Sequence, residues 1–248
     1  MVMRDSAKQL YYDYRFSESV AAYRCQLRDA PDDWANIAGM SHSLMGVGEF
    51  AEAIPYLERL NEYYIGSHPG AQGCQIELSI CHWMIDERET ARDIIKSLVI
   101  AVRDGTVYYA DIPGGVTQGL VLCYMAVTLH ASPDVDLAMK YLKKLAERSG
   151  IKYWPGPAAL FLLGGLTFGE AVKNATGTAD LTRAKAIAEQ DLLKRRHLVA
   201  LLFAAGTERR MAGDEAGCRL LMAECAGLTH PQVEYVWYLA KGEVAAPS

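Results

Sequence analysis

The sequence predicts an all-α protein, an α-solenoid of about six stacked helix pairs closed by a C-terminal capping helix. A short phrase recurs along the chain, in which a small residue follows the starting residue by three positions and a bulky residue follows it by six or seven. The copies start at Phe16, Phe50, Arg88, Val135 and Glu215. Phe16 and Phe50 lie 34 residues apart, a period typical of helix-pair repeats. Of the 248 residues 51% are hydrophobic, which indicates a folded chain with a large core.

Prolines, glycines and acidic caps set the boundaries of the first two pairs, expected at 3–14 with 17–28 and at 33–45 with 51–64. Pro31 ends the first pair, since its ring cannot continue a helix. Asp32 or Asp33 caps the next helix, and Gly48 turns the chain before its partner helix.

The remaining elements follow the same rules, with one interruption at 104–115. We expect further pairs at 71–84 with 89–103, 116–130 with 134–149, 158–164 with 168–176, and 192–211 with 215–226, a single helix at 178–190, and the capping helix at 232–242. Pro133 opens the second helix of the fourth pair, Pro155 and Pro157 precede the fifth, and Pro231 begins the capping helix.

The second pair carries a recognisable pattern of large and small residues. Trp34, Ile37, Ala38 and Ser41 share one helical face, and Ala53, Tyr56, Leu57 and Leu60 share the face expected to pack against it. The small residues at 38 and 53 let the two backbones approach closely. This pair resembles the tetratricopeptide repeat family, with Trp34, Ile37, Ala38 and Ala53 at the family's tryptophan, leucine and two small positions, and Pro31 at its closing proline.

That closing proline is missing after the second pair, where residues 63–70 form a longer link. The second half resembles the closing repeats of bacterial tetratricopeptide proteins at 154–157, 163–164, 203 with 206, 213–214, and 234–235 with 240. The resemblance implies a single helical repeat domain over 1–248, interrupted at 104–115, a bacterial source and a role in protein binding.

Composition argues against several classes of partner. A net charge of −5 does not favour nucleic-acid binding. The longest apolar stretches, 119–129 and 157–166, are too short to cross a bilayer, and the N-terminus lacks the apolar core of a signal peptide. Six scattered cysteines without a CxxC pair are expected to be reduced thiols. We therefore expect a cytoplasmic protein that binds neither nucleic acid nor membranes.

No constellation for catalysis, cofactor or metal binding stands out, so we expect no enzyme. The glycines at 46 and 48 resemble a dinucleotide fingerprint, but they follow a predicted helix rather than a strand. Ser41, His42 and Ser43 are adjacent on a helix and point in different directions. Cys74 and Cys81 are seven residues apart, whereas zinc ligand pairs are closer, so no metal is expected.

The expected binding surface is the concave side, which the first helix of each pair lines in this family. It would present Lys8, Tyr11, Tyr12, His42, Met45, Trp83, Met84 and Arg210. The alternative for Met45 and Trp83 is that they fill gaps in the core. A second candidate is the interruption, with Tyr108, Tyr109 and Asp111, since insertions in repeats are often on the binding face. Its tyrosines could instead plug the junction between the third and fourth pairs. The basic run 194–197 is interpreted as a solvated helix face.

These observations predict a non-enzymatic protein-binding repeat protein without cofactors. The sharper hypothesis is an immunity protein that neutralises a cognate bacterial toxin by direct binding. The alternative is a cytosolic adaptor or co-chaperone that holds a peptide or protein partner in its concave groove. A small helical enzyme is disfavoured by the missing constellations.

Overall fold

The structure, a computed structural model, describes residues 6–68, 70, 72–108 and 112–245. The long regular elements in these ranges are α-helices, and no strand occurs among them, which confirms the predicted all-α class. The contacts between residues divide the chain into two compact units, Met1–Ile94 and Ile95–Ser248, which we call unit 1 and unit 2. The boundary falls within one helix, α6 (Arg88–Arg103). One continuous solenoid over 1–248 therefore stays a prediction.

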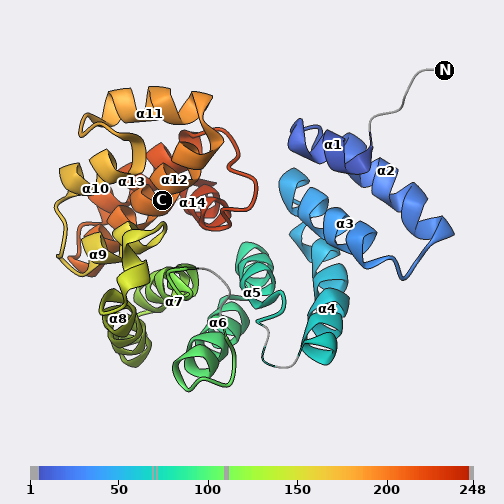
Figure 1. The fold of residues 1–248 in the computed structure, drawn as a ribbon, viewed down its shortest axis with the longest axis horizontal. Coiled ribbons are helices and arrows are strands. Elements are labelled where there is room, and N and C mark those ends of the chain that lie inside the picture. The colour runs from blue at the N-terminus through green and yellow to red at the C-terminus, as the bar shows by residue number, and fades with distance from the viewer. Residues whose placement is uncertain (1–5, 69, 71, 109–111, 246–248) are drawn as a thin grey trace. The chain divides into compact units, whose positions relative to one another are not determined.

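Unit 1 consists of helices that contact their neighbours in chain order. It contains α1 (Ala7–Tyr12), α2 (Phe16–Asp29), α3 (Trp34–Val47), α4 (Phe50–Ser67), α5 (Gln75–Met84) and the first half of α6 (Figure 1). Helix α2 packs against α1 and α3, α4 packs against α3 and α5, and α1 also contacts α3. The helices α2, α3 and α4 start and end within a few residues of the predicted positions.

Small residues set how closely the helices of unit 1 approach. Ala53 is completely buried, as the predicted packing of the second pair requires. Ala38 is only half-buried, and on the same helix Gly39 and Gly46 face large side chains of α2. A Cβ atom on Gly39 would lie 2.0 Å from Cζ of Tyr23, and one on Gly46 would lie 2.7 Å from Cδ1 of Phe16. A larger residue at either position would therefore force the facing ring to move.

The predicted start and end signals of α3 are confirmed, while α5 starts later than expected. The Asp33 side chain accepts a hydrogen bond from the Asn36 amide at 2.9 Å, which satisfies an N–H group of the first turn. Gly48 ends α3 with a φ of +87°, a conformation that favours glycine. Helix α5 begins at Gln75 rather than at residue 71, because Gly73 adopts a φ of +62° and interrupts the helical path.

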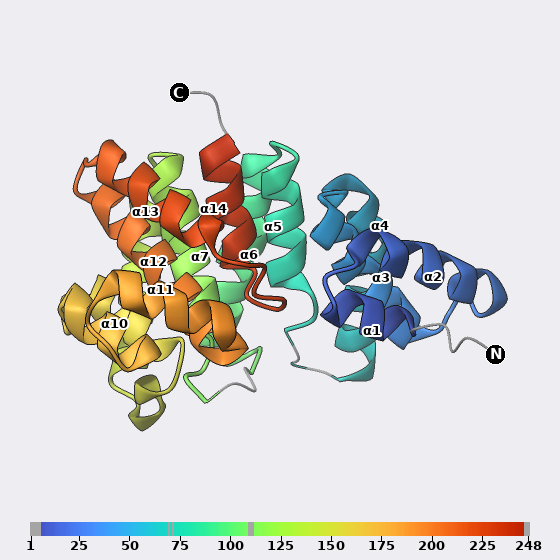
Figure 2. The same ribbon diagram turned by 90° about the horizontal axis from the view of Figure 1, so that it is seen from above.

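Unit 2 is organised around one long helix, α12 (Leu192–Met211). Its other elements are the second half of α6, α7 (Val116–Thr128), α8 (Ser132–Ala146), the 3-10 helix η1 (Ser149–Lys152), α9 (Gly156–Leu162), α10 (Phe168–Thr176), α11 (Leu181–Gln190), α13 (Glu215–Gly227) and α14 (Val236–Ala245). Helix α12 contacts α7, α9, α10, α11, α13 and α14 (Figure 2). Because neighbours surround it, its buried residues form an unbroken run from Leu198 to Thr207 rather than a single stripe.

The capping helix starts four residues later than predicted and ends three residues later, at Ala245 rather than at residue 242. It begins at Val236 rather than at residue 232, because Gln232 adopts a φ of +63° and its amide donates a hydrogen bond to Nδ1 of His230 at 2.9 Å. The end of the interruption 104–115 is tied to unit 2 by Tyr141, whose hydroxyl lies 2.9 Å from the carbonyl oxygen of Gly115. This contact fixes the chain immediately before α7.

Candidate partner-binding surfaces

Three of the residues expected to contact a partner lie together where α1 meets α3 in unit 1. The ring of Tyr11 lies 5.6 Å from that of Tyr12 and 6.3 Å from that of His42, measured between centroids. Phe16 and Tyr14, which the sequence did not single out for binding, extend the group: Phe16 lies 5.4 Å from Tyr11, and Tyr14 lies 6.1 Å from Phe16. We call these five residues the aromatic cluster. Helix packing thus joins rings that are 31 residues apart in the chain.

The aromatic cluster offers exposed tyrosine rings on a buried base. Tyr12 and Tyr14 are 45% and 38% exposed, whereas Tyr11 is only 8% exposed. Burial lowers the pKa of His42 to about 4, so its imidazole is neutral near pH 7. The Lys8 ammonium lies 5.9 Å from the centroid of the Tyr12 ring, within the range of a cation–π contact. The surface is therefore aromatic, and the positive charge of Lys8 lies at its edge.

Met45 and Trp83 belong to the core of unit 1 rather than to a surface. Met45 is 1% exposed and Trp83 is 7% exposed. The Arg88 guanidinium lies over the Trp83 ring, 5.4 Å from its centroid, and covers it further. Of the two alternatives that the sequence left open for these residues, the structure shows the core-filling one. Neither side chain offers a partner more than a small part of its surface.

Arg210, another residue expected on the concave side, is enclosed in unit 2. Its Nη2 lies 2.7 Å from Oε1 of Glu243 and 3.0 Å from Oε2 of Glu215, and its Nη1 donates to Oγ1 of Thr128 at 2.9 Å. The Tyr124 hydroxyl donates to Oε2 of Glu243 at 2.8 Å. We call these five residues the Arg210 network. The network ties α12 to α7, α13 and α14. The Arg210 side chain is only 8% exposed, so little of it is open to a partner, and its role in binding stays a prediction.

The interruption 104–115 places one candidate residue on the surface of unit 2. Tyr108 is 60% exposed, so it does not plug a junction between helix pairs. Tyr109 and Asp111 lie outside the described residues. A binding role for this segment stays a prediction.

The sequence analysis interpreted the basic run 194–197 as a solvated helix face. The structure shows that two of its side chains pack against neighbouring segments instead. Arg195 is 6% exposed and donates from Nη2 to the carbonyl oxygen of Glu189 at 2.7 Å, near the end of α11. Arg196 donates from Nε to the carbonyl oxygen of Pro231 at 3.1 Å. Arg195 therefore satisfies a carbonyl at the end of α11, and Arg196 holds the segment before α14 against α12.

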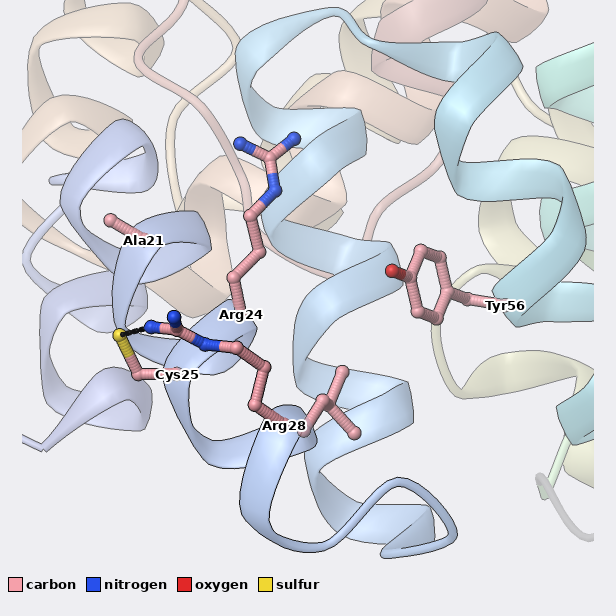
Figure 3. Close-up of a pocket in the computed structure, with 6 residues that line it drawn as sticks. Ala21, Arg24, Cys25, Arg28 and Tyr56 are labelled. Carbon is pink, nitrogen blue, oxygen red and sulfur yellow. Dashed lines mark hydrogen bonds between the residues drawn. The ribbon is translucent and has the colours of Figure 1, made fainter.

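A groove between α2 and α4 is a site that the sequence analysis missed. It has a volume of about 660 Å³ and is lined by Ala21, Arg24, Cys25, Leu27, Arg28 and Tyr56. Figure 3 shows the Tyr56 hydroxyl pointing toward the side of α2 that carries Arg24 and Arg28. One sequence signal was available: Arg24 and Arg28 are four residues apart on one helix, a like-charge spacing that is unfavourable without a compensating partner.

The described residues hold little that suggests chemistry. Among them, no group of three or more histidine, cysteine, aspartate or glutamate side chains gathers to hold a metal ion. Burial raises the pKa values of the Cys74, Cys81 and Cys225 thiols, and raises that of Cys218 to about 11. These thiols therefore stay protonated near neutral pH and are poor nucleophiles. No helix in the described ranges has the length and apolar character needed to cross a membrane.

Comparisons with known proteins add little to this picture. No protein-family model matches the chain, and no curated protein matches it. Among solved structures, the crystal structure of MamA matches over 86% of this chain and 99% of that chain, with a TM-score of 0.45 and 13% sequence identity. At this level of similarity, neither the site nor the function can be transferred from MamA.

Proposed function

We propose that this chain is a non-enzymatic helical-repeat protein of tetratricopeptide type that binds another protein, and that the aromatic cluster of unit 1 contacts the partner. The observation that supports this most is the exposure of Tyr12 and Tyr14 beside the buried ring of Tyr11. The helices α2, α3 and α4 lie where the resemblance to the repeat family places them, which supports the repeat type.

Tyrosine suits this role because it provides a large contact area with only two rotatable side-chain bonds. Tyr11 and Phe16 pack beneath and between the exposed rings, which limits their motion before a partner binds. Less conformational entropy is then lost on association. Because the His42 imidazole is neutral near pH 7, a partner that covers the cluster does not have to remove a charged imidazole from water.

For the partner, we propose a cognate bacterial toxin, which the chain would neutralise as an immunity protein. This finer proposal rests on the sequence alone: the likeness to bacterial repeat proteins and the mildly acidic net charge of −5. The alternative remains a cytosolic adaptor or co-chaperone. If the partner is a toxin, co-expression restores growth of cells that produce it. A partner that forms an intact complex without restoring growth favours the adaptor.

The binding site is tested by substituting the exposed rings. The partner is captured from native lysate with the parent chain, and its Kd is then measured for the parent and for Tyr12→Ala/Tyr14→Ala. Hot-spot residues contribute at least about 2 kcal/mol, so we expect binding to weaken by roughly 30-fold or more.

Two other exposed tyrosines of unit 2 provide controls. Tyr153 is 48% exposed, and Tyr153→Ala should leave the Kd unchanged. Tyr108→Ala tests the interruption as the competing site. A folded Tyr12→Ala/Tyr14→Ala variant that binds like the parent rules out the aromatic cluster, and a loss confined to Tyr108→Ala moves the site to the interruption.

A further inference from the structure

The groove between α2 and α4 combines two cations with a hydroxyl group, and none of its lining residues in the described part of the chain is acidic. Arg24, Arg28 and Tyr56 supply its polar groups, while Ala21 and Leu27 supply apolar surface (Figure 3). None of these residues belongs to the aromatic cluster. The groove is therefore a second surface of unit 1 with a chemistry of its own.

The Arg24 side chain is held by a salt bridge, but some of its N–H groups remain available for a ligand. Its Nη2 lies 2.7 Å from both carboxylate oxygens of Glu52, an ion pair that bridges α2 and α4. Among the described residues, its Nε and Nη1 groups have no hydrogen-bond acceptor. The salt bridge thus restricts the side chain and leaves part of the guanidinium available to a ligand.

Arg28 has no carboxylate partner among the residues that the structure describes. Its Nη2 donates to Sγ of Cys25 at 3.0 Å, a weak acceptor that does not balance its charge. The Tyr56 hydroxyl, on the opposite wall of the groove, also lacks a described hydrogen-bond partner. Figure 3 shows the Arg28 guanidinium turned toward Cys25 and away from Tyr56. Once the Arg28 side chain swings into the groove, a carboxylate between the two walls receives hydrogen bonds from Arg28 and Tyr56, and charge-assisted bonds of this kind are the stronger ones.

We propose that this groove binds a short acidic segment of a partner protein. One carboxylate pairs with Arg28 and Tyr56, a neighbouring carboxylate reaches Arg24, and an apolar side chain contacts Leu27 and Ala21. The preference for acidic groups is confined to this stretch, because the adjacent pocket beyond Arg24 contains Glu49 and Glu52. An open groove of about 660 Å³ has room for a few residues of an extended peptide.

Cys25 provides the reporter for a direct test. It lines the groove and is exposed, whereas the other five cysteines are buried, so a neutral alkylating agent such as iodoacetamide reacts with Cys25 first. The probe is the peptide acetyl-Glu-Glu-Leu-amide, and its matched control is acetyl-Gln-Gln-Leu-amide. With about 10 mM probe and a Kd of about 5 mM, occupancy is roughly two-thirds, and alkylation of Cys25 slows about threefold.

Substitutions of single residues show whether the protection of Cys25 comes from binding in this groove or from the overall charge of the protein. Each rate is compared with that of the same variant without peptide, because Arg28 also contacts the Cys25 thiol. Arg28→Gln is expected to abolish the protection and Tyr56→Phe to reduce it, while Arg103→Gln, which removes the same charge from an exposed position in unit 2, keeps it. Unchanged circular dichroism and Tm establish that each variant is folded.

Three outcomes overturn the proposal. Equal protection by the glutamine peptide removes the role of charge, and full protection in folded Arg28→Gln removes the role of this groove. Equal protection by inorganic phosphate at the same concentration makes the groove a small-anion site rather than a peptide site. Protection by the glutamate peptide alone, lost in Arg28→Gln and kept in Arg103→Gln, supports the acidic segment whether or not the aromatic cluster binds a partner.

Discussion

The Arg210 network keeps a charged group in the interior of unit 2, so each of its members depends on the others. The Arg210 and Glu243 side chains are 8% and 11% exposed. Burial by itself lowers the pKa of Arg210, but the hydrogen bonds to Glu243 and Glu215 outweigh it and raise that pKa, so the guanidinium stays charged. Pairs of this kind add little net stability, yet removal of one partner leaves the other charge buried and unpaired.

We expect Arg210→Met to lower the free energy of unfolding by about 3–5 kcal/mol, the usual loss when a buried pair is broken. Urea unfolding followed by circular dichroism measures it. Arg103→Met is the matched control, because Arg103 and Asp104 form an exposed pair worth at most about 1 kcal/mol. The further change Glu243→Met should recover a large part of the loss. Equal losses for the Arg210 and Arg103 variants would contradict the structural role of the network.

His230 makes the stability of unit 2 depend on pH, because its side chain is buried as the neutral imidazole. Its hydrogen bonds define which ring nitrogen carries the proton. The Gln232 amide donates to Nδ1 of His230 at 2.9 Å, so this nitrogen carries no proton. The proton of the neutral ring is therefore on Nε2, which lies 2.7 Å from the Tyr238 hydroxyl. Burial lowers the pKa of His230 to about 4, and the positive charges of Arg195 and Lys241 lower it in the same direction.

The unfolded chain binds a proton at His230 near pH 6.5, whereas the folded chain does so only near pH 4. Between these values the unfolded state holds more protons, so stability falls as the pH falls from 6.5 to 4, by roughly 3 kcal/mol from this group. His230→Asn keeps an acceptor but cannot titrate, so urea unfolding at pH 7 and pH 4.5 should show a smaller difference than in the parent.

Comparing the parent with His230→Asn separates the contribution of His230 to the pH dependence of stability from that of Glu234. The contribution of Glu234 changes with pH in the opposite direction. Burial raises the pKa of Glu234 to about 7, so its contribution to stability is lost as the pH rises through that value. Identical pH dependence in the parent and His230→Asn would show that His230 titrates alike in both states.

At the scale of elements, local signals predicted most helix boundaries. Asp33 and Gly48 mark ends that were predicted from residue type, because caps and positive φ values depend on neighbours in the chain. The start of α14 was wrong because it depends on the contact of Gln232 with His230. The pairing of Arg195 with the end of α11 was missed for a similar reason, since it requires two helices to meet.

Some features of the candidate sites could be predicted from the sequence, and others depend on contacts that the sequence does not reveal. Tyr11, Tyr12 and His42 could be predicted to share a face because the repeat period relates α1 to α3. The burial of Met45 and Trp83 could not, since the apolar stripe of a helix and a binding stripe look alike in sequence. The α2–α4 groove escaped prediction because its walls come from the second helices of two successive pairs.

Ala53 tests the packing of the second pair directly. Because this residue is completely buried, Ala53→Trp should force α3 and α4 apart and cost at least about 1–3 kcal/mol, the range for overpacked cores. Ala51 is exposed on the same helix, and Ala51→Trp should leave the Tm nearly unchanged. Equal melting temperatures for the two variants would mean that the face of α4 has been misassigned.

At the scale of the whole molecule, the six cysteines sample both compact units. Cys25, Cys74 and Cys81 lie in unit 1, and Cys123, Cys218 and Cys225 lie in unit 2. All except Cys25 are buried. Since a buried thiol reacts only after the surrounding structure opens, thiol labelling reports the stability of each unit separately.

We expect one thiol to react rapidly in the native protein and all six to react after denaturation. With a short pulse of alkylating agent at increasing urea concentration, Cys74 and Cys81 should lose protection together, because both lie in α5 or at its N-terminal end within one compact unit. Cys123, Cys218 and Cys225 should likewise lose protection together, since α12 packs against both α7 and α13, which carry them. Mass spectrometry of the labelled peptides gives each midpoint.

If Cys123 became reactive at much lower urea than Cys225, unit 2 would not unfold cooperatively, and the central role of α12 would be contradicted. One shared midpoint for all five buried thiols would instead show that the two units unfold as a single cooperative domain.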